Sequence, residues 1–218
     1  MRLTTALVGT IAALVALPSA GRGRWNQAYP ADAMAVRDAR RFVVIGGGLA
    51  GGTAAEALRE NGHDGDITVV AAEPYPPYQR PPLSKDYLQG KQERAAVFVH
   101  DEQWYAEHDV TLLLGETADR IDRDGGRVLL DSGGELPYTT LVLATGASPR
   151  RPDLPGADLP GVHLLRRIED SDALRRAFGQ AKSLAVLGAG WIGLEVAASA
   201  RQAGLDVTVV APDGVPLQ

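Results

Sequence analysis

A pattern that occurs twice constrains this fold most: an apolar run of strand length, a glycine-rich turn and a stretch of helix-forming residues. The first copy is RFVVI at residues 41–45, followed by GGGLAGG and the helix formers TAAEALREN. The second is LAVL at 184–187, followed by GAGWIG and a predicted helix over 192–202. Another apolar run follows each helix, ITVVAA at 67–72 and DVTVV at 206–210. Such strand–helix–strand units pair their strands in parallel, so we predict an α/β protein with two Rossmann-like βαβ domains.

The glycines of both turns have the spacing G-x-G-x-x-G, which is typical of dinucleotide-binding turns. We expect the residues of these turns to lie at the cofactor. They are Gly46, Gly48, Leu49, Ala50 and Gly51 in the first turn and Gly188, Gly190, Ile192 and Gly193 in the second. The first glycine makes a tight turn, the second lets a pyrophosphate approach the backbone, and the third lets helix and strand pack closely. The helix N-terminus then faces the anion. One copy is a weak signal, but two copies with strands and helices in place predict dinucleotide binding.

The region between the two units has its own pattern. Residues 101–108 are predicted to form a short helix, and VTLLLG at 110–115 a strand. Three short segments separated by DGG and SGGELP then predict a small antiparallel β-meander. TTLVLATGA at 139–147 is predicted to be a buried strand, and the proline-rich residues 148–161 a linker. The predicted domains are therefore an N-terminal extension at 1–40, a first domain at 41–150 and a second at 151–218.

Composition excludes several classes of function. The chain of 218 residues has a formal net charge of −5, which provides no basic field to attract nucleic acid. It contains no cysteine, which excludes disulfides, thiolate metal sites and any dithiol redox centre made from its own residues. Its hydrophobic content of 45% is enough for an ordinary core. We expect no metal site and no membrane partner, and the oligomeric state stays open.

The N-terminal extension has two interpretations. Its apolar residues 6–17 are similar to a signal peptide and are too short to span a bilayer comfortably. Alternatively, translation starts at Met34, shortly before the first predicted strand. Export of a prefolded protein uses a twin-arginine signal, which the first residues lack. We therefore expect a cytoplasmic protein, with export as the alternative if residues 1–20 are a real signal peptide.

Residues 41–218 resemble the flavoprotein reductases that bind two dinucleotides in a glutathione-reductase-like fold. In that superfamily the first glycine motif holds FAD and a second, inserted domain holds NADH or NADPH. LVLATGA at 141–147 resembles the strand by which the chain passes from the flavin domain toward the nicotinamide domain. Full members of the superfamily are longer, so the resemblance implies that this chain is a truncated N-terminal portion.

The segment YQRPPLSK at 78–85 indicates the branch of this superfamily. Disulfide reductases place a redox-active cysteine pair in this region, and this chain has none. YQRPPLSK and GAGWIGLEVAASAR resemble the reductases of ferredoxin, rubredoxin and putidaredoxin, with the apoptosis-inducing-factor relatives. This resemblance implies hydride transfer from NAD(P)H to FAD and single-electron transfer to a ferredoxin-like or rubredoxin-like protein. An apoptosis-inducing-factor-like signalling protein and a small-molecule reductase of the monodehydroascorbate type are the alternatives.

The resemblance also implies roles for individual residues. Arg80 and Lys85 match flavin-contacting basic residues, with Lys85 beside the isoalloxazine, where a cation stabilises negative charge on reduced flavin. Glu195 matches an acid near nicotinamide and flavin, paired with Lys85, although a glutamate early in a helix is also favoured by the helix dipole. Arg150 matches a flavin-binding arginine, and Ala118 a position whose backbone meets the adenine.

The acids that would bind ribose are less regular. The rule places Asp or Glu at the end of the second strand of each unit. In the first unit Ala72 occupies the first such position, and Glu73 is the acid that follows. In the second unit Ala211 stands at this position, with Asp213 two residues later, and no arginine replaces it to receive a 2′-phosphate. The choice between NADH and NADPH therefore stays open.

Overall fold

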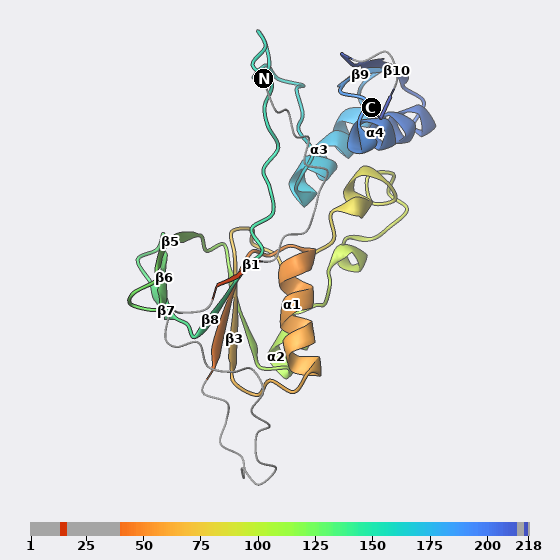
Figure 1. Cartoon of the computed structure of the whole chain (residues 1–218). Helices are drawn as coiled ribbons and strands as arrows, with labels where there is room; N and C mark the ends of the chain where they lie inside the picture. The colour runs from red at the N-terminus through yellow and green to blue at the C-terminus, as the bar shows by residue number, and fades with distance from the viewer. Residues whose placement is uncertain (1–13, 17–39, 213–215, 218) are drawn as a thin grey trace. The chain divides into compact units, whose positions relative to one another are not determined.

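A computed structural model describes residues 14–16, 40–212 and 216–217 (Figure 1). These residues form two compact units, and the chain passes between them more than once. The first unit contains the described residues up to Tyr78 together with Val99–Gly146, and the second contains Gln79–Phe98 and the described residues from Ala147 onward. No helix in the described part of the chain is long and apolar enough to cross a bilayer.

The first unit is built on a five-stranded sheet with the order β1-β8-β2-β3-β4. The strands are β1 (Leu14–Ala16), β8 (Thr140–Leu143), β2 (Arg41–Ile45), β3 (Asp66–Ala71) and β4 (Val110–Leu114). The last four run parallel, and β1 pairs antiparallel with β8. Of the predicted N-terminal extension, the structure describes β1 and Arg40. Met34, the alternative start, and the rest of the extension, including the other signal-like residues, lie outside the described residues.

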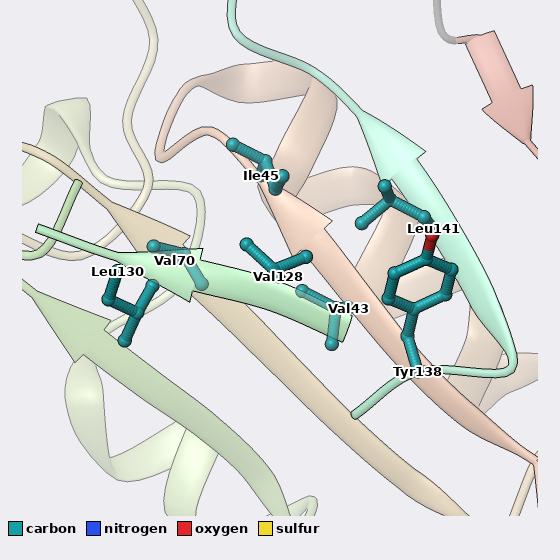
Figure 2. Packing of buried hydrophobic residues seen from close by; sticks show 7 residues of the cluster. All are labelled: Val43, Ile45, Val70, Val128, Leu130, Tyr138 and Leu141. Carbon is teal, nitrogen blue, oxygen red and sulfur yellow. The ribbon is translucent and has the colours of Figure 1, made fainter. Parts of the chain in front are cut away.

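Alternate residues of the parallel strands fill two cores, one on each face of the sheet. On one face Val44, Ile67 and Val69 are buried with Ala55 and Tyr105, which belong to α1 (Leu49–Glu60) and α2 (Glu102–Glu107). The opposite face is covered by the meander of β5 (Ala118–Asp122), β6 (Arg127–Leu130) and β7 (Glu135–Pro137). Its core consists of Val43, Ile45, Val70, Val128, Leu130, Tyr138 and Leu141 (Figure 2). Burial on both faces explains why these strands read as continuous apolar runs.

The predicted meander and parallel unit are both confirmed. β5, β6 and β7 pair antiparallel in sequence order, and Asp122 and Glu135 both bind Arg127 across the strands, at 2.9 and 3.0 Å. In the parallel sheet Ile45 lies beside both Val70 and Leu143. The carboxyl ends of β2, β3 and β8 therefore meet at one edge of the sheet.

The second unit contains the second βαβ unit and two segments that pack on its helix. β9 (Ser183–Leu187) and β10 (Asp206–Val210) pair in parallel through the crossover helix α4 (Trp191–Gln202). The other helices are α3 (Ile168–Phe178) and the short 3₁₀ helices η1 (Pro81–Ser84) and η2 (Arg94–Val97). Helix α3 begins at Ile168, just after two backbone N–H groups, of Arg166 and Arg167, that donate to the Asp170 carboxylate at 2.9 and 2.7 Å.

The segment Gln79–Phe98 packs with the second unit, although the sequence prediction placed it within a first domain of residues 41–150. Its apolar side chains explain this difference. Leu88 is buried against Leu174 of α3 and Val196 of α4. Pro81 and Pro82 occupy the first positions of η1, where their fixed φ suits a helical start and no N–H is needed.

Truncation of the buried Ile67 should test the core between the sheet and α1. Ile67 is 1% exposed, so Ile67→Ala should lower the free energy of unfolding by about 2–5 kcal/mol through lost burial and a residual cavity. Ile121→Ala is the matched control, because Ile121 is 36% exposed and should change stability by about 0.5 kcal/mol or less. Urea unfolding followed by circular dichroism measures both, and equal losses would contradict this assignment of the core.

Candidate functional site

The first glycine turn follows β2 at the carboxyl edge of the sheet. Gly46 has φ +127°, and a side chain there would overlap the carbonyl oxygen of Ala144, which follows β8. A Cβ on Gly51 would overlap the carbonyl oxygen of Gly46. By contrast, a Cβ on Gly48 would have no atom within 4 Å. The turn is therefore packed tightly at its first and third glycines and open at its second.

The second glycine turn, after β9, is similar at its second and third glycines. A Cβ on Gly193 would overlap the carbonyl oxygen of Gly188, and a Cβ on Gly190 would have no atom within 4 Å. Gly188 has φ +107°, a conformation that favours glycine, but a Cβ there would also have no atom within 4 Å. In both units the middle glycine, at which the spacing predicts approach of a pyrophosphate, is therefore open.

The helices that follow these turns begin without a side-chain cap. The N-cap residues of α1 and α4 are Gly48 and Gly190, and neither helix has an acidic residue in its first turn. In contrast, Asp101 caps α2 by accepting the Trp104 N–H at 2.8 Å. The first N–H groups of α1 and α4 lie at the positive end of each helix dipole, and no carboxylate in the first turn of the same helix neutralises that end. The chemistry of both turns fits a phosphate group.

Glu73 lies just beyond β3, beside the first glycine turn. The hydroxyl of the fully buried Tyr78 donates to Glu73 Oε2 at 2.5 Å, and Tyr78 also forms a bridge with Gly48. Ala72 is exposed. The structure therefore places Glu73 at the edge where the sequence predicts a ribose-binding acid, and its role stays a prediction.

Two other predicted cofactor contacts lie in separate parts of the chain. Ala118 is partly buried at the start of β5 in the first unit. Arg150 is exposed in the coil after β8 and belongs to the second unit. Their roles stay predictions. In the second unit Ala211 directly follows β10, and Asp213 lies outside the described residues.

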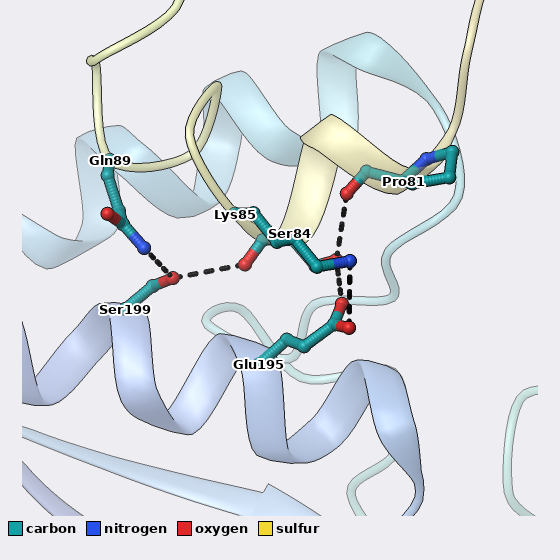
Figure 3. Close-up of polar contacts among 6 residues, drawn as sticks. All are labelled: Pro81, Ser84, Lys85, Gln89, Glu195 and Ser199. Carbon is teal, nitrogen blue, oxygen red and sulfur yellow. Dashed lines mark hydrogen bonds and ion pairs between the residues drawn. The ribbon is translucent and has the colours of Figure 1, made fainter.

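Lys85 and Glu195 form an ion pair in the second unit (Figure 3). Lys85 directly follows η1, and Glu195 projects from α4. Lys85 Nζ lies 2.8 Å from Glu195 Oε1. The pairing that the resemblance implied is therefore present.

Three polar residues in this network were missed by the sequence prediction. Ser84 Oγ donates to Glu195 Oε2 at 2.5 Å. Ser199 Oγ donates to the carbonyl oxygen of Ser84 at 3.0 Å, and Gln89 Nε2 donates to Ser199 Oγ at 2.9 Å. Glu195 and Ser199 are four apart in α4 and so share one helix face. The spacing of four residues could have identified this polar face, but no pattern in the sequence around it indicates which segment packs against the face.

The donors around Glu195 set its electrostatics. Partial burial alone raises the pKa of this carboxyl, but hydrogen bonds from Lys85 and Ser84 and the charge of Lys85 outweigh it, so the pKa is below its ordinary value. Tyr87, in the same segment, donates to Asp172 Oδ1 at 2.8 Å. Burial, followed by this hydrogen bond, raises the pKa of Tyr87 to about 12, so Tyr87 stays a neutral donor.

A cavity of about 220 Å³ adjoins the ion pair within the second unit. Its lining includes Arg80, Lys85 and Glu195, together with Trp191 and Ile192 of α4. Arg80 Nη1 donates to the carbonyl oxygen of Arg166 at 2.8 Å. Trp191 and Ile192 are 66% and 52% exposed, large fractions for apolar side chains. The structure thus brings together Arg80, Lys85, Ile192 and Glu195, four of the residues predicted from the sequence.

Two βαβ units, each with a glycine turn open at its middle glycine and an uncapped helix, define a two-dinucleotide-binding α/β protein. The family model described as pyridine nucleotide-disulphide oxidoreductase matches residues 40–217. The chain belongs to this family.

Relatives of known name and structure are similar over most of this chain. Rhodocoxin reductase from Rhodococcus erythropolis is 49% identical over 169 residues, which is 78% of this chain and 40% of that protein. Monodehydroascorbate reductase from Arabidopsis thaliana is 37% identical over 193 residues, 82% of this chain and 39% of that protein. In the solved covalent putidaredoxin reductase–putidaredoxin complex, the matched chain has a TM-score of 0.77 and 38% identity, with coverage of 82% of this chain and 44% of that chain. The chain spans about two fifths of the curated relatives named here.

The family is named for disulphide chemistry, but this chain has no cysteine to carry it. Within the described ranges, no three His, Asp or Glu side chains are grouped so that they could hold a metal ion. The charged residues that line the cavity are instead Arg80, Lys85, Arg166 and Glu195. These groups can bind and orient a ligand and set its local field.

The lowered pKa of Glu195 predicts how this ion pair depends on pH. Because its folded-state pKa lies below the ordinary value of about 4.3, its stabilisation is present above that pH and is lost as the pH falls through the folded pKa. Glu195→Gln should therefore cost most stability above about pH 5 and progressively less as the pH falls below about 4.3 through the folded pKa. The cost should be under about 1 kcal/mol, because Lys85 is 46% exposed.

Urea unfolding between pH 3 and pH 7 measures this difference. Glu93→Gln, which removes an exposed carboxyl in the same unit, is the control for the loss of one negative charge. A Glu195→Gln effect that stays constant down to pH 3 would argue against the lowered pKa.

Proposed function

We propose that this chain forms the dinucleotide-binding part of a reductase that uses NAD(P)H and FAD to pass single electrons to a small iron–sulfur protein. The observation that carries this proposal is the repeated glycine turn, closed at its third glycine and open at Gly48 and Gly190. A chain with two such turns can hold an electron donor and an electron acceptor together. Family membership supports the use of a pyridine nucleotide.

The first unit would hold FAD and the second NAD(P)H. At the first turn, Gly46 and Gly51 keep the backbone tight, Gly48 leaves room for the pyrophosphate, and Glu73 accepts from the adenosine ribose. Gly188, Gly190 and Gly193 do the same in the second unit. When bound, FAD supplies the chemistry: it takes a hydride from NAD(P)H and can release its electrons singly.

The other predicted residues would orient the flavin and set the electrostatic field around it. We assign flavin contacts to Arg80, Lys85 and Arg150, and a backbone contact with the adenine to Ala118. Lys85 supplies positive charge that favours the reduced flavin, and Glu195 holds that lysine in place and faces the nicotinamide. No side chain needs to form a covalent intermediate, because the contribution of the protein is placement and electrostatics.

Two kinds of acceptor have support from the relatives. Rhodocoxin reductase and the putidaredoxin reductase complex favour a small iron–sulfur protein, and the absence of cysteine fits electron transfer better than disulfide reduction. Monodehydroascorbate reductase supports a small-molecule acceptor as the second candidate, at lower identity. A cytoplasmic location remains our prediction, since it rests on the absence of a twin-arginine signal.

The acceptor can be identified by turnover. The whole protein that carries this chain, loaded with FAD, should oxidise NADH or NADPH and reduce a ferredoxin, rubredoxin or putidaredoxin, followed by the absorbance of the acceptor. Faster reduction of monodehydroascorbate than of all three would favour the second candidate. Oxidation of NAD(P)H without reduction of either acceptor class would overturn the electron-transfer proposal.

Substitution of the two open glycines should separate the two cofactors. Gly48→Ala should reduce FAD retention at least tenfold, because the added methyl occupies the space of the pyrophosphate. Gly190→Ala should keep FAD and raise the NAD(P)H concentration needed for half-maximal flavin reduction at least tenfold. Flavin absorbance after gel filtration and stopped-flow bleaching at the flavin band measure these effects.

Both variants should keep the fold, because neither new methyl meets a protein atom within 4 Å. Gly51→Ala is the contrasting control, since its Cβ would overlap the Gly46 carbonyl oxygen and should lower the melting temperature. If Gly190→Ala instead lost FAD and Gly48→Ala did not, the assignment of cofactors to units would be reversed.

A further inference from the structure

The two oxygens of the Glu195 carboxylate are held by two different donors. Ser84 Oγ donates to Oε2 at 2.5 Å, and Lys85 Nζ lies 2.8 Å from Oε1 (Figure 3). A single donor would leave the carboxylate free to turn about its last torsion, which is a soft one. Two donors on separate oxygens fix both its position and its plane.

The two donors differ in rigidity. The Lys85 side chain is 46% exposed and has four rotatable bonds, so much of its freedom is lost only when the pair forms. Ser84 is 4% exposed and has one side-chain torsion before its hydroxyl. It also lies in η1, which begins with Pro81 and Pro82. The serine hydroxyl is therefore the donor whose place is fixed in advance.

Two buried serines of the neighbouring helices hold the backbone of this segment. Ser199 of α4 donates to the carbonyl oxygen of Ser84 at 3.0 Å, and Ser171 of α3 donates to the carbonyl oxygen of Leu83 at 2.8 Å. Ser171 and Ser199 are 0% and 2% exposed. Helices α3 and α4 thus present the Ser84 hydroxyl to Glu195 from a fixed frame, independently of the position of Lys85.

We propose that Ser84 is a positioning residue for the Lys85–Glu195 pair. Its hydroxyl keeps Glu195 ionised and turned toward Lys85, so that the lysine charge stays at one place beside the cavity. Ser84 Oγ also lies 3.4 Å from the Pro81 carbonyl oxygen, so the 2.5 Å hydrogen bond to the carboxylate is much the shorter of the two. The consequence for the reductase reaction rests on the proposed function, whereas the effect on Glu195 does not.

The test is Ser84→Ala in the whole protein. Loss of one hydrogen bond to a charged group should raise the pKa of Glu195 by about one unit. Carbon-13 NMR of the glutamate carboxyls measures this without cofactor turnover, and Glu195→Gln identifies the signal. The acid limb of the pH profile for NAD(P)H oxidation should move to higher pH by the same amount, and Ser84→Thr, which keeps a hydroxyl, should restore both.

Tyr87→Phe is the matched control, because it removes a hydroxyl of the same segment that donates to Asp172 and not to Glu195. It should leave the Glu195 pKa and the acid limb unchanged. A Ser84→Ala pKa equal to that of the wild type, or an equal shift in Tyr87→Phe, would overturn the proposal. If the wild type fails to oxidise NAD(P)H but Ser84→Ala alone still shifts the pKa, the proposed function fails and the positioning role stands.

Discussion

The close approach of backbone at the carboxyl edge of the sheet is the constraint on which the first unit depends. The carbonyl oxygen of Ala144, just after β8, lies where a side chain on Gly46 would be, and the carbonyl oxygen of Gly46 lies where a side chain on Gly51 would be. Strand, turn and helix are therefore locked to one another by the absence of two side chains. A Cβ on Gly48, between these two glycines, would have no atom within 4 Å, so tight packing and open space are provided by neighbouring residues of one turn.

The second unit obtains its order from a different source. Its two-stranded sheet is small, and several side chains of β9 and β10 are exposed, including Leu187 and Val210. Much of its packing comes from the segment Gln79–Phe98, which adds Leu88 to the apolar contact between α3 and α4. Buried serines of both helices hold this segment by donating hydrogen bonds to its carbonyl oxygens. The basic residues Arg80 and Lys85 thus flank a short 3₁₀ helix held by two longer helices, and Glu195 belongs to one of those helices.

The sequence allowed the elements to be predicted well, because the parallel strands are continuous apolar runs and glycines mark both turns. The placement of Gln79–Phe98 could not be predicted, since a proline-rich segment has no periodicity that identifies the surface it will meet. The same reason explains why Ser84 was missed. Its partner Glu195 is 111 positions away, and no local pattern connects the two. Lys85 and Glu195 were identified from the family resemblance, whereas the residues that orient them could be identified only from the three-dimensional structure.

The uncapped starts of α1 and α4 have a consequence for how the protein reaches its folded state. A helix without a capping side chain leaves its first N–H groups to water until an anion arrives, so each bound nucleotide completes the helix as well as occupying a site. Ligand that binds the folded state alone stabilises it by mass action. Nucleotide bound at these turns would therefore stabilise the helices that begin there as well as fill the two sites.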